Sequence, residues 1–499
     1  MSLTLQQVAA HNNASSCWVI IANKVYDVTD FLPDHPGGRK VILQYAGRDA
    51  TSVYEPLHPP DALEKNIPPE KHLGSLTQDA QNTISEQNKK KKKTVDEERV
   101  ERAQREKPKI ERMLSLRDIE HVARKVLSHK ALAYYSSATD DEITYNENER
   151  AFSRFFFNAR VLRAVSRCNT STTILGFSSS IPVFVCGAAL AKLGHPLGEA
   201  CITIGAHKTG IIQMISSNAS LSSGEISAAR PSPSQVLFFQ LYKNKDNSIA
   251  EKRVKEIESQ GYKAIFLTVD AVVASNRERD LRAPFELEDM EKAGLQGTTE
   301  GEKPRQIGDA TAEEEQIQEG KETEFGGTAG SLLNNDDVDM TWEETIPWLR
   351  SVTKLPIVLK GIQCVEDAVR AAEAGVDGIL ISNHGGRQLE YSLPSMEVLY
   401  RLHKQRPDIF SKMEVYLDGG VRRGTDVLKA LCLGAKAVGM GRPFLYALSA
   451  YGEAGVVKTV HILERELVAG MRLLGVSSLQ ELTPEMVERV DWQPVSAKL

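Results

Sequence analysis

Residues 356–384, PIVLKGIQCVEDAVRAAEAGVDGILISNH, contain two short apolar segments with a helix-like stretch between them. The segments PIVLKG (356–361) and GILISNH (378–384) are rich in β-branched and other apolar residues, which favours strands. Because neither segment alternates with polar residues, both strands are expected to be buried on their two faces, as in a parallel sheet. The stretch therefore predicts one strand–helix–strand unit.

The same pattern recurs between about residues 110 and 485. The other apolar runs are IPVFVCG (181–187), IIQMIS (211–216), VLFFQLY (236–242), AIFLTVD (264–270), EVYLDGG (414–420) and AVGMGRP (437–443). Eight such units predict an α/β fold, a closed (β/α)8 TIM barrel, with an open doubly wound sheet as the alternative.

Composition limits the classes of protein to consider. The chain has 499 residues, which predicts two or three domains unless one barrel takes most of the length. A net charge of −6 gives no indication of nucleic-acid binding. The six cysteines include no CxxC pair, which argues for reduced thiols. No apolar run reaches the roughly 18–20 residues of a membrane span, and no signal or transit peptide is expected.

We expect four regions along the chain. They are a compact domain (1–78), a charged flexible linker (79–108), the barrel domain (109–485) and a C-terminal tail (486–499). The linker contains five lysines at 89–93, for which a nuclear-localisation signal is the alternative interpretation. A polar stretch at about 284–340 predicts a mobile loop after the fourth strand, either a lid or a simple insertion.

Polar side chains lie at the ends of the predicted strands, where the active site of a barrel is built. They are Ser216, Gln240, Tyr242, Thr268, Asp270, Lys360, His384 and Arg387. A purely structural barrel has less reason to end nearly all of its strands in polar residues. The pattern therefore predicts a catalytic face at these ends.

The motif SNHGGRQ (382–388) places His384 three residues before Arg387. Histidine is the natural base near neutral pH, and the planar arginine side chain can hold a carboxylate by two hydrogen bonds. Such a pair would suit deprotonation of a hydroxy acid, whereas a loop histidine beside a surface arginine is the alternative. Asp270 is a candidate to orient His384, and a buried Lys360 could stabilise negative charge that develops on a cofactor.

Glycine-rich turns end the last two predicted strands, in DGGVRRG (418–424) and GMGRP (439–443). Barrels commonly bind phosphate at this position through backbone amides and a helix N-terminus. Arg422 and Arg442 could neutralise such a phosphate. Tight turns without a ligand are the alternative.

Two histidines of the N-terminal domain lie in short loops beside helix-like stretches. His35 belongs to DHPGG (34–38), and His58 follows 23 residues later in YEPLHPP (54–60). Two neutral imidazoles facing one apolar slot could ligate haem iron from both sides, which suits electron transfer. Turn or capping histidines are one alternative, and a zinc site with about four ligands is another. The further candidates for zinc, at unsuitable spacing, are His11, Cys17 and His72.

From residue 112 to about 485 the chain resembles the FMN-dependent α-hydroxy-acid dehydrogenases and oxidases. The resemblance rests on AYYSSATDDEIT, FFQLY, LTVDA, IVLKGI, SNHGGRQL, LDGGVRRGTDVLKALCLGA and GRPFLYA, in this order. It implies FMN as a cofactor, held by Ala188, Ser216, Gln240, Thr268, Lys360, Asp418, Gly420, Arg422, Gly441 and Arg442.

The resemblance also implies catalytic roles. His384 would take the substrate's proton with support from Asp270, and Lys360 would stabilise the reduced flavin. The carboxylate and hydroxyl of the substrate would be bound by Tyr134, Tyr242, Arg277, Arg387 and Asn218, of which Tyr134, Tyr242 and Arg387 also belong to the catalytic set.

Four features depart from the usual pattern of this family. Ala188 stands where threonine is more common, and Ala138 stands where glycine is usual. The stretch TVDAVVASNRERD lacks the usual Pro-x-Leu-Gly around 272–275, which weakens the assignment of Arg277. Asn218 replaces the apolar pocket residue of lactate-specific relatives and therefore bears on the choice of substrate.

Residues 2–77 resemble the cytochrome b5 fold, on Trp18 and the stretches VYDVTDF and AGRDAT. This resemblance implies a small α+β domain that binds haem b through His35 and His58. The two domains together imply oxidation of an L-2-hydroxy acid, first of all L-lactate to pyruvate, with electrons passed singly through the haem to cytochrome c. The alternatives are an oxidase that uses O2 and keeps a regulatory or vestigial haem domain, and a non-enzymatic electron-transfer or sensor protein.

The resemblance has implications for assembly and compartment as well. It implies a homotetramer, with the C-terminal tail contributing to the contacts. It also implies the mitochondrial intermembrane space, whereas the absence of a visible presequence favours the cytoplasm.

Overall fold

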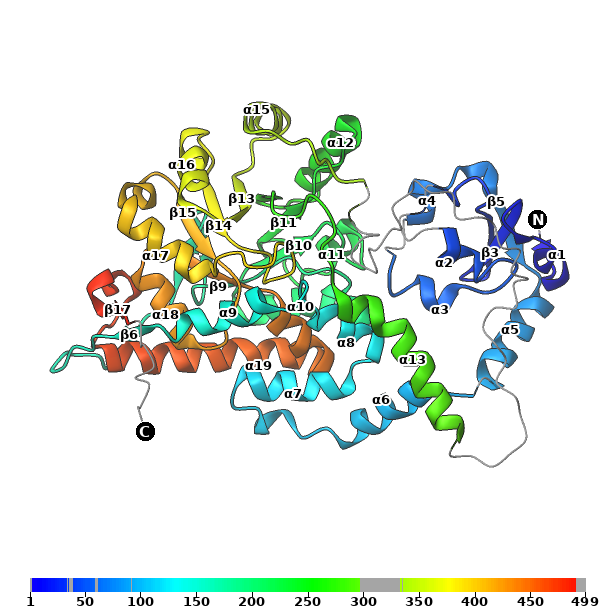
Figure 1. The fold of residues 1–499 in the computed structure, drawn as a ribbon, viewed down its shortest axis with the longest axis horizontal. Helices are drawn as coiled ribbons and strands as arrows, with labels where there is room; N and C mark the ends of the chain where they lie inside the picture. The colour runs from blue at the N-terminus through cyan, green and yellow to red at the C-terminus, as the bar shows by residue number, and fades with distance from the viewer. Residues whose placement is uncertain are drawn as a thin grey trace, which may run out of the picture.

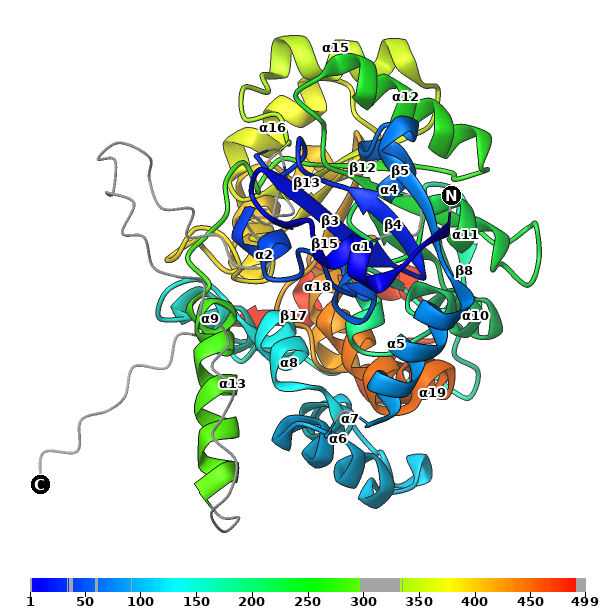
Figure 2. The same cartoon turned by 90° about the vertical axis from the view of Figure 1, so that its right-hand side faces the viewer.

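A computed structural model describes residues 2–33, 35, 39–58, 62–90, 92–296, 333 and 335–490. An N-terminal unit and a larger barrel lie side by side along the long axis of the molecule (Figure 1). The view turned by 90° shows the N-terminal unit in front of the barrel (Figure 2). Among the helices that are described, none is long and apolar enough to cross a membrane.

The predicted barrel is confirmed. Its strands are β9 (Val183–Val185), β10 (Gln213–Ser216), β11 (Leu237–Leu241), β12 (Ile265–Thr268), β13 (Ile357–Ile362), β14 (Gly378–Ile381), β15 (Glu414–Leu417) and β16 (Ala437–Met440). Neighbouring strands are parallel, and β9 pairs with both β10 and β16, so that the sheet closes on itself. The alternative of an open doubly wound sheet is therefore wrong.

Helices cover the outside of the barrel. They include α10 (Glu199–Thr209), α11 (Ser223–Ala228), α12 (Asn247–Ser259), α15 (Trp342–Val352), α16 (Val365–Glu373), α17 (Ser395–Gln405), α18 (Gly424–Cys432) and α19 (Arg442–Leu474). Side chains that accept backbone N–H groups begin several of these helices, as Ser222 does for α11 and Asp246 for α12.

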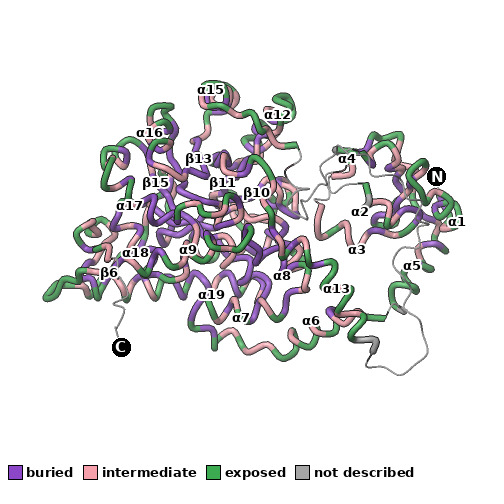
Figure 3. The backbone as a smooth tube through the Cα atoms, in the orientation of Figure 1, coloured by how far each residue is buried: buried purple, intermediate pink, exposed green. Residues whose placement is uncertain are grey.

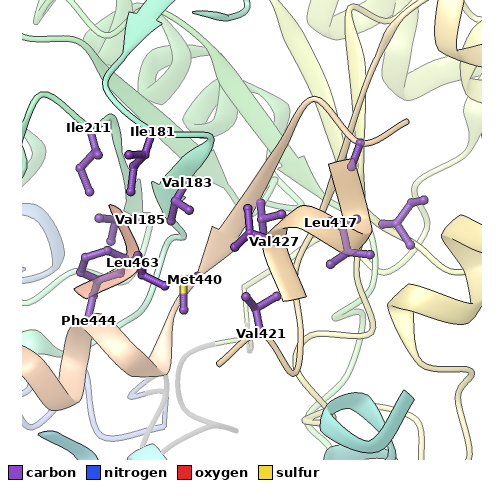
Figure 4. Packing of buried hydrophobic residues seen from close by; sticks show 14 of the residues in the cluster. Ile181, Val183, Val185, Ile211, Leu417, Val421, Val427, Met440, Phe444 and Leu463 are labelled. Atoms are coloured by element: carbon purple, nitrogen blue, oxygen red, sulfur yellow. The ribbon is translucent and has the colours of Figure 1, made fainter. Parts of the chain in front are cut away.

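The barrel strands are buried on both faces, as their continuous apolar sequences predict (Figure 3). In β9, Phe184 points to the inner cluster, while Val183 and Val185 belong to the outer one. The inner cluster also contains Phe238, Phe266 and Tyr416. Figure 4 shows the outer cluster, in which strand residues lie beside residues of α18 and α19. The alternation of strand side chains thus separates the barrel interior from an apolar layer under the helices.

The segment before the barrel closes one end of it and reaches the C-terminal part of the chain. It contains α7 (Leu116–Val126), α8 (His129–Ser136), α9 (Ile143–Phe152), β6 (Phe155–Phe157), and a hairpin of β7 (Thr172–Ile174) and β8 (Phe177–Ser179). Strand β6 pairs with β17 (Val487–Arg489), so the start of the expected tail is part of the folded domain. Residues 491–499 lie outside the described residues.

The N-terminal unit is a small α+β domain. Its sheet has the order β1 (Ser2–Leu3), β5 (His72–Leu76), β4 (Lys24–Asp27), β3 (Ser16–Ile21) and β2 (Asn12–Asn13). Val19 and Ile21 face one apolar cluster and Ile20 faces another, as the two-residue period of a strand requires. Helices α1 (Leu5–Ala9), α2 (Arg39–Leu43), α3 (Thr51–Tyr54) and α4 (Ala62–Asn66) surround the sheet.

Residues 79–108, which we expected to form a flexible linker, are largely helical. Helix α5 covers Gln78–Lys90 and α6 covers Val95–Glu106. Thr94 and Glu97 form a capping box at the start of α6, and Arg99 donates hydrogen bonds to the carbonyls of Lys125 and Leu127 at the end of α7. Low apolar content misled the prediction, because α6 is held by caps and polar contacts rather than by an apolar face.

The prediction of a mobile loop at about 284–340 is also wrong over the first part of that range. Helix α13 covers Glu278–Gln296 and contacts both α6 and α8. The Glu286 carboxylate lies 2.6 Å from Nε2 of His129, and Glu291 accepts the backbone N–H of Val95 at 2.7 Å. These contacts fix residues that look like solvent-exposed loop in the sequence. Residues 297–332 lie outside the described residues.

Candidate active site

A cavity opens at the carboxyl ends of the barrel strands. It encloses about 1240 Å³ of space free of protein atoms, counting its opening to solvent. The predicted site residues that line it are Tyr134, Ala188, Ser216, Asn218, Tyr242, Arg277, Lys360, His384, Arg387, Asp418, Gly420, Arg422, Gly441 and Arg442. The barrel thus brings together side chains that are almost 310 residues apart in sequence, as expected for this face of the fold.

His384 and Asp270 form a hydrogen-bonded pair at the floor of the cavity. Nδ1 of His384 lies 2.8 Å from Oδ1 of Asp270, whose side chain is fully buried. His384 has a φ of 57°, a left-handed conformation that is rare outside glycine and tends to occur at functional sites. Burial, followed by the charge of Lys360, lowers the pKa of His384 to about 4. The imidazole is therefore neutral near pH 7, with Nδ1–H donated to Asp270 and Nε2 left as a base.

Lys360 completes this charged cluster. Its Nζ lies 3.3 Å from Oδ2 of Asp270 and 3.3 Å from Nδ1 of His384. Burial opposes the positive charge, but Asp270 and Asp418 outweigh it and raise the pKa of Lys360. Gly361 follows, with a φ of +115°, and a Cβ there would lie 2.5 Å from Cβ of Asp270. Glycine is therefore needed at this position for Lys360 and Asp270 to meet.

Two arginines make one wall of the cavity positive. Arg387 donates to the carbonyl of Tyr134 at 2.8 Å, and its guanidinium lies 5.1 Å from the centre of the Tyr134 ring. Arg277 donates to the carbonyl of Arg387 at 3.1 Å and to Gln388. Burial, followed by the charge of Arg277, lowers the pKa of Arg387 to about 10. An anion between these guanidiniums would relieve their repulsion, so the wall suits a carboxylate.

Tyr242 faces the base from the neighbouring wall. Its hydroxyl lies 3.4 Å from Nε2 of His384, and burial raises its pKa, so that the phenol stays protonated. Asn218 lies on the loop after β10, and its backbone N–H donates to Oγ of Ser216 at 3.1 Å. A ligand oxygen that lies beside both groups would therefore meet a donor and a base.

A chain of polar side chains crosses the ends of three adjacent strands. Oγ of Ser216 on β10 donates to Gln240 on β11 at 3.1 Å, and Gln240 donates to Oγ1 of Thr268 on β12 at 2.9 Å. Ser216 lines the cavity, whereas Gln240 and Thr268 lie behind it. Such a row of donors and acceptors fits the polar edge of a flavin ring.

The end of the cavity that is predicted to bind phosphate is basic, and protein groups accept some of the hydrogen bonds of its arginines. Arg422 pairs with Glu120 at 2.8 Å, and Arg442 donates to the carbonyl of Gly385 at 2.8 Å. Gly420 has a φ of +81°, and a Cβ there would lie 2.2 Å from the carbonyl oxygen of Asn148. Asp418 is buried, and its Oδ1 has no hydrogen-bond partner. An orphaned acceptor and two arginines that line one cavity fit a ligand with hydroxyl groups and a phosphate, as the ribityl phosphate of FMN has.

His35 and His58 come together in the N-terminal unit. Their ring centres are 6.1 Å apart. A metal ion lies roughly 2 Å from each imidazole nitrogen, which places the centres of two ligating rings about 6 Å apart. Nδ1 of His58 lies 3.0 Å from the carbonyl of Tyr54, which fixes its proton there and leaves Nε2 for a metal. Burial lowers the pKa of His58, so it is neutral, as a ligand must be. The pair therefore fits one haem iron.

The zinc alternative receives no support. The described residues contain no group of three or more metal-ligating side chains. His11 stacks on Trp18, and His72 lies 3.0 Å from the carbonyl of Ile67 through Nε2.

Several contact residues escaped the sequence interpretation. Ser275 and Gln388 hold Arg277, and Asn148 and Asn383 exchange two hydrogen bonds of 2.8 Å below the cavity. In the N-terminal unit the ring of Tyr54 stacks on His58 at 4.2 Å. Gln388, Asn148 and Asn383 contact distant segments, so no spacing in the sequence marks them, whereas Ser275 and Tyr54 lie close in sequence to their partners Arg277 and His58.

Comparison with known proteins gives the class. Residues 123–489 match the family model of the FMN-dependent dehydrogenases, and residues 4–77 match that of the cytochrome b5-like haem/steroid-binding domains. The chain belongs to the FMN-dependent dehydrogenase family and carries a cytochrome b5-like domain ahead of its barrel. It is an oxidoreductase whose cofactors are FMN and haem.

Individual proteins are similar to this chain over most of its length. L-lactate dehydrogenase (cytochrome) of Wickerhamomyces anomalus is 45% identical over 98% of this chain and 80% of its own length. The protein of the same name from Saccharomyces cerevisiae is 43% identical over 97% of this chain and 79% of its own length. Glycolate oxidase 3 of Arabidopsis thaliana is 38% identical over 77% of this chain and 98% of its own length. Among solved structures, the flavin-binding domain of baker's yeast flavocytochrome b2 is 39% identical, with a TM-score of 0.69, over 81% of this chain and 95% of that one.

Proposed function

We propose that this chain oxidises an L-2-hydroxy acid, L-lactate to pyruvate, and passes the electrons singly through its haem to cytochrome c. The observation that carries the proposal is the His384–Asp270 pair, at 2.8 Å, in a cavity with a positively charged wall. The same chain holds a second site, the His35–His58 pair. Relatives called L-lactate dehydrogenase (cytochrome) align with 97–98% of the chain, and so with both sites.

Proton removal is the part of the reaction that the chain's own residues perform. Nε2 of His384 accepts the proton of the substrate hydroxyl, since the other ring nitrogen is committed to Asp270. The Asp270 carboxylate, whose pKa Lys360 and His384 lower to about 2 against the effect of burial, stays ionised and stabilises the imidazolium. Tyr242 is placed to donate to the same substrate oxygen.

The substrate carboxylate is proposed to bind at Arg387, with Arg277 and Tyr134 beside it. Arg387 cannot turn freely, because it donates to carbonyls of α8 and the loop after it. Its fixed guanidinium would place the hydroxyl-bearing carbon near His384, so that binding also orients the substrate.

FMN, when bound, takes up two electrons from the substrate and releases them one at a time. The residues proposed to hold its ring are Ser216, Gln240, Thr268 and Lys360, with Ala188 offering a backbone contact. Asp418, Gly420, Arg422, Gly441 and Arg442 are proposed to hold the ribityl phosphate. The permanent charge of Lys360 would favour electron density on the nearby edge of the ring.

Anaerobic mixing with L-lactate tests this function. We expect the flavin absorbance to bleach first and the spectrum of a reduced b-type haem to follow. Bleaching with a haem that stays oxidised would instead support an oxidase that uses O2. This alternative is motivated by the similarity of the barrel to glycolate oxidases. No bleaching with any 2-hydroxy acid would refute both enzymatic functions.

We propose that the identity of the acid depends on Asn218, which lines the cavity. An amide tolerates a more polar side chain on the substrate than a hydrocarbon pocket does. We therefore propose that the chain accepts polar 2-hydroxy acids besides L-lactate. Flavin bleaching rates for a series of acids, in the chain and in Asn218→Leu, would measure this.

We also propose that the chain assembles as a homotetramer and works in the mitochondrial intermembrane space. The support for both is similarity to the yeast enzymes alone. Light scattering on the purified protein and fractionation of cells would test them separately.

A further inference from the structure

The loops that follow β9 and β10 are joined by one buried carboxylate, Glu199, at the start of α10. Glu199 is only 2% exposed. Its Oε1 accepts the backbone N–H groups of Ala191 at 3.1 Å and Ser220 at 2.9 Å. Oε2 accepts the N–H of Leu221 at 3.3 Å. Burial raises the pKa of Glu199, while these backbone hydrogen bonds lower it and favour the charged form. The carboxylate thus bridges the two loops.

The joined loops hold a strained backbone. Leu190 has a φ of +60°, a left-handed conformation that is strained for a bulky residue. Its N–H donates to the carbonyl of Asn218 at 3.3 Å, and its own carbonyl accepts the hydroxyl of Tyr135 at 2.7 Å. Glu199 binds the next N–H along the chain, that of Ala191. Such strain persists only where the surroundings hold it in place.

One loop of this pair lies between the two predicted redox sites. Asn218 lines the flavin cavity, and two residues later Oγ of Ser220 donates to the carbonyl of Pro56 in the N-terminal unit at 3.4 Å. Leu57 packs against the apolar cluster of the barrel, and the haem ligand candidate His58 follows it. The N-terminal unit is therefore seated on the barrel by the segment that leads directly to His58.

We propose that Glu199 is a positioning residue. It fixes the barrel loop against which the haem-binding unit packs, and it thereby sets the rate at which electrons pass between the cofactors. The inference rests on the proposed function. In Glu199→Gln one carboxylate oxygen is replaced by an NH2 donor, so at least one of the N–H groups of Ala191, Ser220 and Leu221 loses its acceptor, and a buried N–H group without a partner is costly. The loops would separate and Ser220 would leave Pro56, while the His384–Asp270 pair, which Glu199 does not touch, would stay.

Amide hydrogen exchange on the full chain tests the positioning without substrate. In Glu199→Gln we expect faster exchange not only at 189–192 and 219–222 but also at 55–58, across the contact with the N-terminal unit. Glu225→Gln is a matched control, because Glu225 accepts N–H groups only within the capping box of the adjacent helix α11. Faster exchange confined to the two barrel loops would show a merely local role and would overturn the proposal.

Electron passage is the second readout. We expect the ratio of the haem-reduction rate to the flavin-reduction rate to fall about tenfold in Glu199→Gln, the upper part of the range for coupling residues. Ser220→Ala, which removes only the direct contact with Pro56, should lower the same ratio by about threefold and serves if the Glu199 variant fails to fold. If the variants fold and the ratio of the two rates is unchanged, the proposal is refuted. This holds also when both rates fall by the same factor.

Photochemical reduction of the flavin separates this result from the proposed function. The flavin then receives electrons without any hydroxy acid, so the rate of haem reduction can be compared between variants even if L-lactate is not the substrate. Failure of L-lactate to bleach the flavin would contradict the function alone, whereas equal photochemical rates in Glu199→Gln and Glu225→Gln would contradict the role of Glu199 alone.

Discussion

At the scale of single residues, the surroundings of His384 give it the properties that its proposed role as the base requires. His384 adopts a left-handed backbone, and its N–H is held by Oγ of Ser382 at 3.1 Å. Asp270 fixes which ring nitrogen carries the proton. Burial and Lys360 together keep the ring neutral. These are the conditions under which a histidine in a buried site can accept a proton at neutral pH.

Replacing the base is the first prediction. His384→Gln should leave FMN and haem bound and lower the turnover number by roughly 10²-fold or more, the scale of losing a general base. Steady-state reduction of cytochrome c, with the flavin and haem absorbance as loading controls, measures it. Near-normal turnover would show that another residue takes the proton.

The second prediction concerns pH. The pKa of His384 is about 4 in the folded chain, against an ordinary value of 6.5. Between these values the unfolded chain binds a proton that the folded chain does not, so stability is lost as the pH falls from 6.5 towards 4. The urea midpoint of the barrel should fall over this window, and fall less in His384→Gln. Equal falls in both proteins would contradict the lowered pKa.

At the scale of elements, polar contacts hold helix α6 in place, and the hydrophobic pattern of the sequence does not reveal them. Helix α6 buries Asp96, which binds Arg99 at 2.6 Å and the backbone N–H of His129 at 2.9 Å. Arg99 also reaches two carbonyls at the end of α7. A segment that looks like solvated linker is therefore attached to the barrel.

The third prediction tests this attachment. Arg99→Ala should free α6, since Asp96 would be left buried without its charged partner, and proteolytic cleavage within 92–108 should become several times faster. Arg102→Ala, on an exposed position of the same helix, is the matched control. Equal cleavage rates for the two variants would show that α6 is held by other contacts.

At the scale of the whole molecule, two sites with different chemistry share one chain. The barrel cavity holds a base and positive charge, and the N-terminal unit holds two facing imidazoles. The two units touch through Pro56 and Leu57, next to His58. An electron route from the first site to the second is consistent with this arrangement.

The fourth prediction separates the two sites. His58→Ala should abolish haem binding and reduce the cytochrome c reduction rate by at least about tenfold, because both axial ligands are needed for this type of haem. Bleaching of the flavin by L-lactate should continue. His11→Ala, which alters a histidine stacked on Trp18, is the control. Full cytochrome c reduction without haem would mean that the flavin is the direct donor.

Much of the architecture follows from local sequence. Eight apolar runs predicted eight strands, and all of them form the closed barrel. Polar residues at the strand ends, such as Ser216 and His384, could be assigned to one face because the carboxyl ends of parallel strands meet. The predictions for 79–108 and 284–296 failed because low apolar content was taken as lack of structure. Helix α6 begins with a local capping box, and polar contacts attach α6 and α13 to distant residues.

By itself, the sequence determined the period of the fold, the identity of the reactive side chains and the pairing of a barrel with a haem-type module, because these depend on local pattern and residue chemistry. Which of those side chains touch depends on how distant segments of the chain pack together. The contact of Asp270 with His384, the neutrality of that histidine and the bridge from Glu199 through Ser220 to Pro56 all join segments far apart in the chain. Distances and burial of this kind arise only when the chain closes on itself, and they set the protonation states on which the proposed chemistry depends.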